Sequence, residues 1–333
     1  NNASTNKTTV TLEAIRWVTF KNLKIESTGS SNAWGVHLTN ACRNIAFENC
    51  FINLSTSGTT QNVFGIVASA SPTSESASGD NIAGLTIKDS RFVGGERSVQ
   101  LMVPLTNYSS GFDIYNNIFV SNYYSSLGLY NLQNIDVRGN NMSTFRDNGA
   151  NAIVAYDIDN FKIEQNYILS RNYGVYAQDV NLNANSASSF INNIISTGGH
   201  GVYFNNARIL NVQHNTIVGS PAIRFNSYSG VDLRNNILYG NGGYAFYCPA
   251  ANGFSELNWN HYYSTSTNKY FYDNINYGAL NAWQNANTIL NPNSFEGAPS
   301  ILSTANPYLS TSKIAERAAD IGISIDIDGE TRC

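Results

Sequence analysis

The chain has 333 residues, of which 42% are hydrophobic and only 13% are charged, and its net charge is −4 at pH 7. This balance argues against a nucleic acid as partner, because such proteins need a surplus of basic residues. No run of residues is apolar and long enough for a transmembrane segment, and the four cysteines are too few to define a disulfide framework.

One short phrase recurs nine times between Leu23 and Leu238. It consists of an apolar residue, two variable residues, a turn usually marked by Asn, and another apolar pair. The copies read FKNLKI, FENCFI, IKDSRF, IYNNIF, VRGNNM, IEQNYI, FINNII, VQHNTI and LRNNIL. The distances between them are 27, 40, 27, 23, 26, 27, 22 and 21 residues, which is typical of solenoid coils.

A second phrase with strand-like alternation follows each copy, as in GVHL at 35–38 and GVYF at 201–204. A weaker third strand leads into the next copy. Three short strands in one repeat leave no room for a crossover helix. The sequence therefore predicts an all-β parallel β-helix of about nine to ten coils over residues 1–250.

Asparagine marks the turn of most copies. In a parallel stack, equivalent residues lie one above another, so that side-chain amides can bond from coil to coil and tolerate left-handed turns. We expect these residues to be structural: Asn22, Asn49, Asn116, Asn192 and Asn235 in one column, and Asn117, Asn140, Asn166, Asn193, Asn215 and Asn236 in the next.

These phrases resemble the right-handed parallel β-helix superfamily that includes pectate-lyase-like enzymes, over roughly residues 10–250. The resemblance implies the right-handed winding. Its enzymatic motifs do not carry over: the clustered Asp motifs of polygalacturonases are absent from the sequence, as is the arrangement of Lys, Arg and acidic calcium ligands typical of β-helix lyases. The resemblance therefore assigns no catalytic residue.

The repeat ends near Gly253, and residues 251–333 are expected to form a capping segment. Its sequence, from SELNWNHYY to DIDGETR, resembles the C-terminal region of bacterial cell-surface β-helix proteins. In those proteins this region precedes an anchoring or sorting domain. That implies a secreted, extracellular or cell-surface protein and a larger multidomain chain. Its aromatic residues are expected to cover the end of the solenoid: Trp259, Tyr262, Tyr263, Tyr270, Phe271, Tyr272 and Trp283.

Turn lengths suggest where a ligand binds. Long turns in the first, second, fourth and fifth coils would form a wall beside the short turns of the sixth to eighth, and such a groove suits an extended polysaccharide. One outward column is expected to read Gln100, Tyr130, Val154, Tyr176, Tyr203, Arg224 and Tyr247. The expected substrate-binding residues are Tyr123, Tyr124, Tyr130, Tyr173, Tyr176, Tyr203 and Arg224.

Two functions fit this groove. In a uronate polysaccharide lyase, Arg146 or Arg171 would neutralise the carboxylate, and His200, Tyr173 or Tyr176 would transfer the proton; Asp147 belongs to the same set of turns. A lyase is favoured over a glycoside hydrolase, because no carboxylate pair stands out as acid and base. The alternative is a non-catalytic adhesin or stalk, in which Tyr and Arg simply cover an exposed β-surface.

Calcium is the one cofactor that the sequence suggests. Asp157 and Asp179 follow equivalent strands and are expected one rung apart, where a cation would relieve their repulsion, with Asn206 as a further oxygen ligand. The other interpretation is that both carboxylates cap turns at strand ends.

Overall fold

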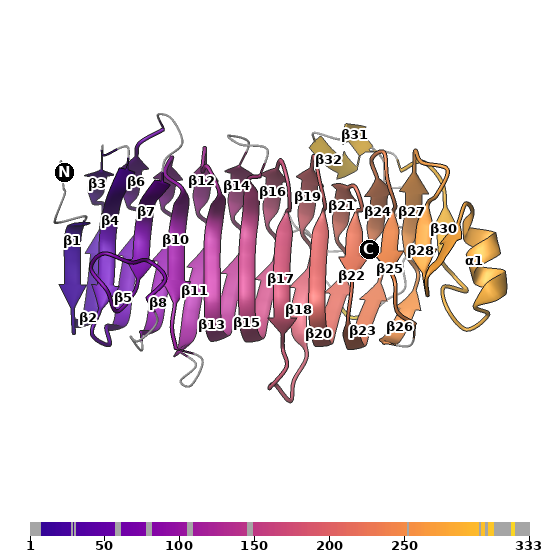
Figure 1. Cartoon of the computed structure of the whole chain (residues 1–333), viewed down its shortest axis with the longest axis horizontal. Helices are drawn as coiled ribbons and strands as arrows, with labels where there is room; N and C mark the ends of the chain where they lie inside the picture. Colours follow the sequence, from indigo (N-terminus) through magenta and orange to yellow (C-terminus); the bar gives the residue numbers. More distant parts are fainter. Residues whose placement is uncertain are drawn as a thin grey trace. The chain divides into compact units, whose positions relative to one another are not determined.

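The structure is a computed structural model, which describes residues 8–27, 29, 31–56, 61–77, 82–104, 109–144, 149–251, 253–299, 301–303, 306–309 and 321–323. The chain divides into unit 1, residues 1–162, and unit 2, residues 163–333. Strands stack side by side in each unit (Figure 1). Each unit is a parallel β-solenoid, and the described residues form about nine turns, so the predicted fold class is confirmed.

Each coil of unit 1 contributes strands to two sheets. The strands of the larger sheet are β1 (Thr8–Glu13), β2 (Arg16–Lys21), β4 (Ser31–Thr39), β5 (Arg43–Glu48), β7 (Gln61–Ala68), β8 (Ala83–Lys88), β10 (Arg97–Met102), β11 (Ser109–Tyr115), β13 (Ser125–Arg138) and β15 (Asn151–Glu164). The strands of the smaller sheet are β3 (Lys24–Ser27), β6 (Phe51–Leu54), β9 (Arg91–Val93), β12 (Ile118–Val120) and β14 (Asn141–Thr144).

Unit 2 repeats this plan. Its larger sheet holds β17 (Val175–Val180), β18 (Ser188–Ile191), β20 (Val202–Gln213), β22 (Ile223–Phe225), β23 (Tyr228–Arg234), β25 (Phe246–Cys248), β26 (Phe254–Asn258), β28 (Tyr270–Tyr272) and β29 (Ile275–Tyr277). Its smaller sheet holds β16 (Tyr167–Ser170), β19 (Ile194–Thr197), β21 (Thr216–Gly219), β24 (Ile237–Gly240), β27 (His261–Ser264) and β30 (Phe295–Glu296). Helix α1 (Leu280–Ala286) and the hairpin of β31 (Ile301–Ser303) and β32 (Asn306–Leu309) complete it.

Alternation of side chains fills the interior. In unit 1, Val36 pairs with Ile66, Ile66 with Val99, and Val99 with Leu127, and all four side chains are buried. Because successive residues of a strand point to opposite faces, the residues between them face outward. In this part of unit 1 the alternating neighbours His37, Val67 and Gln100 are buried as well, so alternation sets the face of a side chain but not its exposure.

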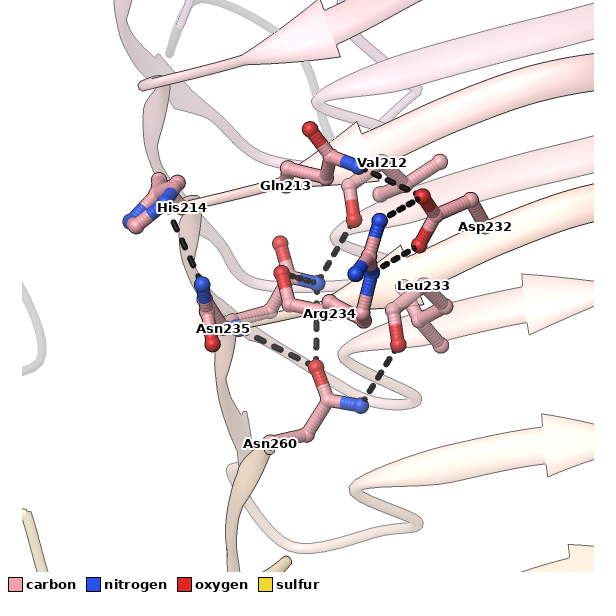
Figure 2. A network of polar contacts seen from close by, with 9 residues as sticks. Val212, Gln213, His214, Asp232, Leu233, Arg234, Asn235 and Asn260 are labelled. Carbon is pink, nitrogen blue, oxygen red and sulfur yellow. Dashed lines mark hydrogen bonds and ion pairs between the residues drawn. The ribbon is translucent and has the colours of Figure 1, made fainter. Parts of the chain in front are cut away.

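The inner asparagine column forms a hydrogen-bonded ladder, as predicted. In unit 2, the side-chain nitrogen of Asn193 donates to Oδ1 of Asn215 at 3.0 Å and to the carbonyl of Ile163 at 2.8 Å. The ladder reaches Asn260, whose amide donates to the carbonyl of Leu233 at 2.9 Å (Figure 2). The other asparagine column has positive φ, for example 58° at Asn192, so both columns have a structural role.

The solenoid continues beyond residue 250, where the capping segment was expected to begin. Strand β26 pairs in parallel with β23, β27 with β24, and β28 with β25. The cap follows: Trp283 of α1 is fully buried, and its ring lies 5.0 Å from that of Phe246 and 5.3 Å from that of Tyr270. Tyr262, Tyr270, Tyr272 and Trp283 are buried as expected, whereas Trp259, Tyr263 and Phe271 remain partly exposed.

Within the described residues, no helix is long and apolar enough to cross a membrane.

Candidate functional site

Five side chains of unit 2 lie in one register column on the outside of the larger sheet. Tyr176 pairs with Tyr203, Tyr203 with Arg224, Arg224 with Tyr247, and Tyr247 with Phe271. The predicted column of Tyr176, Tyr203, Arg224 and Tyr247 is therefore confirmed. With their neighbours they form what we call the tyrosine–arginine face: Tyr173, Tyr176, His200, Tyr203, Arg224, Asn226, Tyr244, Tyr247 and Phe271.

Arg224 is held at the centre of this face. Its guanidinium carbon lies 4.8 Å from the ring centroids of both Tyr203 and Tyr247, a cation–π arrangement. Its Nε and Nη2 atoms donate to Oδ1 of Asn226 at 3.2 and 3.1 Å. The Asn226 amide in turn donates to the Tyr203 hydroxyl. Nη1 donates to none of the described residues, so this edge is available to a ligand.

The aromatic rings pack mainly on one another. The rings of Tyr247 and Phe271 are stacked 4.6 Å apart at 14°, while those of Tyr176 and Tyr203 meet edge to face at 5.2 Å. A ring whose faces are covered by its neighbours presents its edge to a ligand. The face therefore presents hydroxyl and guanidinium edges more than free ring faces.

His200 lies beside the column, in a turn between two strands. Its ring is 4.7 Å from that of Tyr173 and 6.3 Å from that of Tyr203. Burial, and then the charge of Arg224, lower the pKa of His200, whereas burial raises the pKa values of Tyr173 and Tyr203. At neutral pH an unprotonated imidazole therefore stands beside protonated phenols, which is the pairing that proton transfer requires.

The backbone of the turns around His200 packs closely on neighbouring coils. The amide of Gly198 donates to the carbonyl of Ser170 at 3.2 Å, and the amide of Gly201 donates to that of Pro221 at 2.9 Å. A β-carbon on Gly201 would lie 2.2 Å from the carbonyl oxygen of Ala222, so only glycine fits there. Close backbone packing therefore fixes the conformation of the turns beside His200.

The predicted catalytic arginines contribute less to this picture. Arg171 is exposed at the turn after β16, and Arg146 and Asp147 lie outside the described residues, as does that part of the expected wall. The arginine that the structure places against the tyrosines near His200 is Arg224, which the sequence assigned to substrate binding. The sequence did not single out Asn226, which directly follows β22, and it assigned Phe271 to the C-terminal cap rather than to this face.

Unit 1 carries the remaining predicted tyrosines. Tyr124 and Tyr130 pack around Arg97, Tyr130 stacks on Tyr156 at 5.4 Å, and the amide of the half-buried Tyr123 donates to the Gly95 carbonyl at 2.8 Å.

Part of the expected outward column needs correction in this unit. Gln100 pairs with Gly128, whereas Tyr130 pairs with Met102, two positions further along the strands. Val154 is buried, so it offers no outer surface.

The two candidate calcium ligands occupy left-handed turns. Their φ angles are 53° for Asp157 and 55° for Asp179. The carboxylate of Asp179 accepts hydrogen bonds from the amides of Asn206 at 2.6 Å and Gln178 at 3.1 Å. The described part of the chain has no group of three or more His, Cys, Asp or Glu that could hold a metal ion. These contacts favour the turn role.

Comparison with known proteins identifies the fold. Residues 141–295 match the family model described as a right handed beta helix region. The comparisons with curated proteins and with solved structures gave no match. Over these residues the match agrees with the expected right-handed β-helix, and the resemblance to the pectate-lyase-like superfamily stays a prediction.

Proposed function

We propose that this right-handed β-helix binds an extended polysaccharide along the tyrosine–arginine face of unit 2. The observation that carries the proposal is the immobilised guanidinium of Arg224, between two tyrosine rings and with Nη1 unused among the described residues. A planar, preorganised donor of this kind suits a carboxylate, because little side-chain entropy is lost on binding.

The length of the face supports an extended ligand. Five successive rungs carry its column, and neighbouring strands are roughly 4.8 Å apart, so the column extends over about 19 Å. Because the rings present mainly edges, we propose that hydroxyl and carboxylate groups of the ligand make the contacts. A secreted or cell-surface location is part of this proposal, since that is where a structural polysaccharide would be met.

The finer proposal is β-elimination on a uronate polysaccharide. Arg224 would neutralise the carboxylate and make the adjacent C–H more acidic, and neutral His200 would remove that proton. A C=C bond then forms as the glycosidic C–O bond breaks, and the phenol of Tyr173 donates a proton to the leaving oxygen. Arg224 takes the role that the sequence gave to Arg146 or Arg171.

The alternative is a non-catalytic adhesin or stalk segment. One observation favours it: aromatic rings stack on aromatic rings, and asparagine amides bond to asparagine amides, from coil to coil. These contacts stiffen a unit, and the groups that make them are not left to bind a ligand. In that case the face would bind sugar without turnover, or not at all.

Binding should be measured with oligogalacturonate, oligoalginate and a neutral galactan by calorimetry. We expect Arg224→Gln to weaken binding of the acidic oligosaccharide about 10- to 100-fold, the size of a charge-assisted hydrogen bond. Arg208→Gln removes an exposed arginine of the same unit and should leave binding unchanged. Equal effects of the two substitutions would refute the assignment of the face.

Turnover is followed by the ultraviolet absorbance of the unsaturated product. A lyase requires that His200→Gln abolishes product while binding changes by less than about three-fold, an affinity difference below 1 kcal/mol. Binding without product in the unmodified protein would favour the adhesin.

A further inference from the structure

The half-buried basic side chains fall into two groups. Among the described residues, Lys88, Arg234 and Lys269 each form an ion pair, with Glu48, Asp232 and Glu296 respectively. Arg97 and Arg224 are also half-buried, and neither lies within ion-pair distance of any described carboxylate. A cation that is partly removed from water without a counter-charge is costly, so a role for it must be sought.

Arg97, in unit 1, is held much as Arg224 is in unit 2. Its Nη1 atom donates to Oε1 of Gln100 and, at 3.1 Å, to the hydroxyl of Tyr130. Its guanidinium carbon lies 4.7 Å from the ring centroid of Tyr124 and 5.9 Å from that of Tyr130. An amide oxygen and two tyrosines therefore orient each of the two arginines.

The carboxylate nearest in sequence does not neutralise Arg97. An oxygen of Glu96 accepts a hydrogen bond from the backbone amide of Asn62 at 2.6 Å, which directs that carboxylate to the neighbouring coil. Burial raises the pKa of Glu96, in spite of the Asn62 amide and the charge of Arg97. The Glu96 carboxylate is thus held by the Asn62 amide rather than by the guanidinium.

Gly128 leaves room for the side chains of Gln100 and Arg97. It is the register partner of Gln100, and a β-carbon at this position would lie 2.3 Å from Oε1 of Gln100 and 3.1 Å from Nη1 of Arg97. A larger residue would therefore displace the Gln100 amide oxygen that accepts from Arg97 and would press against the guanidinium itself. The absence of a side chain is thus needed to keep Arg97 against its two hydrogen-bond partners.

We infer that Arg97 is a second anion-binding position, in unit 1, which takes a carboxylate or sulfate ester of a polysaccharide. The inference takes its ligand class from the proposed function, but its residues are separate from those of the tyrosine–arginine face. A protein with two such positions binds an acidic chain more tightly than either position alone when both can be engaged together.

The test measures binding of short oligogalacturonate, of a sulfated galactan oligosaccharide and of neutral galactotetraose to the full chain by calorimetry. In the Arg224→Gln variant, we expect the remaining binding of the acidic oligosaccharides to come from Arg97. Adding Arg97→Gln should then weaken it at least about 10-fold, and Gly128→Ala should weaken it while keeping the charge. Arg91→Gln, an exposed arginine in unit 1, is the control.

Each outcome is informative. If the acidic ligands bind the Arg97→Gln, Gly128→Ala and control variants equally well, the second position is refuted while the proposed face stands. If only the Arg97 and Gly128 variants lose binding and Arg224→Gln does not, the second position is supported and the face is refuted. Comparison of the carboxylated and sulfated ligands identifies the anion, and equal binding of the neutral one would overturn an anion site. Circular dichroism checks folding, and Gly128→Ala carries the test if Arg97→Gln does not fold.

Discussion

The imidazole ring of His200 lies 4.7 Å from the phenol ring of Tyr173, and its Nδ1 atom is buried without a hydrogen-bond partner among the described residues. An unsatisfied ring nitrogen beside a protonated phenol is an arrangement that stability alone does not require, because burying a polar atom without a partner costs free energy. It agrees with the proton-transfer role proposed for His200.

His200 should titrate below the usual range of histidine. Burial and the Arg224 charge both disfavour its protonated form. Nuclear magnetic resonance of the ring protons should show this lowered pKa, and Arg224→Gln should move it upward. Because the unfolded state binds the proton more readily, His200 destabilises the fold as pH falls from about 6.5 toward its folded pKa. An unshifted titration in both proteins would contradict the proposed environment.

Asn193→Ala should lower the stability of unit 2. Asn193 is fully buried, donates to Ile163 and Asn215, and accepts from the backbone amide and side chain of Asn166. Loss of the amide leaves several buried groups unpaired, each worth about 1–3 kcal/mol. Urea unfolding followed by circular dichroism should show a lower midpoint. Asn281→Ala, at an exposed position of α1, should not.

Trp283→Ala should destabilise the C-terminal cap by about 3–5 kcal/mol, the usual cost of truncating a buried aromatic side chain. Trp283 has 0% of its surface exposed, and Trp17 has 79%. The same substitution at Trp17 is thus a matched control with almost no expected loss. Thermal unfolding compares the two variants, and similar melting temperatures would show that the cap is not packed as described.

Glu296 should make the cap sensitive to acid. Burial alone would raise its pKa, but the hydrogen bonds from Lys269 and from the backbone amide of Leu280 outweigh burial and lower it. A depressed carboxyl pKa contributes stability that is present above the unfolded value, near 4.5, and is lost as pH falls through the folded one. Glu296→Gln should therefore lower the melting temperature at pH 7 and weaken its dependence on pH in the acid range. Unchanged melting curves would disprove this role.

The repeated Asn phrase alone was enough to predict the coils and the ladder. A left-handed turn residue such as Asn192 is a local requirement. Repetition of the next position in every coil brings the amides of Asn193 and Asn215 together. The column of Tyr176, Tyr203 and Arg224 followed from the same periodicity, because the turns between these strands are short.

Tertiary structure decided what periodicity could not. Pairing across the turns of unit 1 set Gln100 opposite Gly128 rather than Tyr130, and parallel pairing added a coil beyond residue 250. Ring orientation and the lack of a carboxylate partner within the described residues for Arg97 and Arg224 also became visible only in three dimensions. Sequence spacing predicts the strand register where the turns are short, as between Tyr176 and Tyr203. The register in unit 1, the packing and the counter-charges depend on contacts between distant parts of the chain.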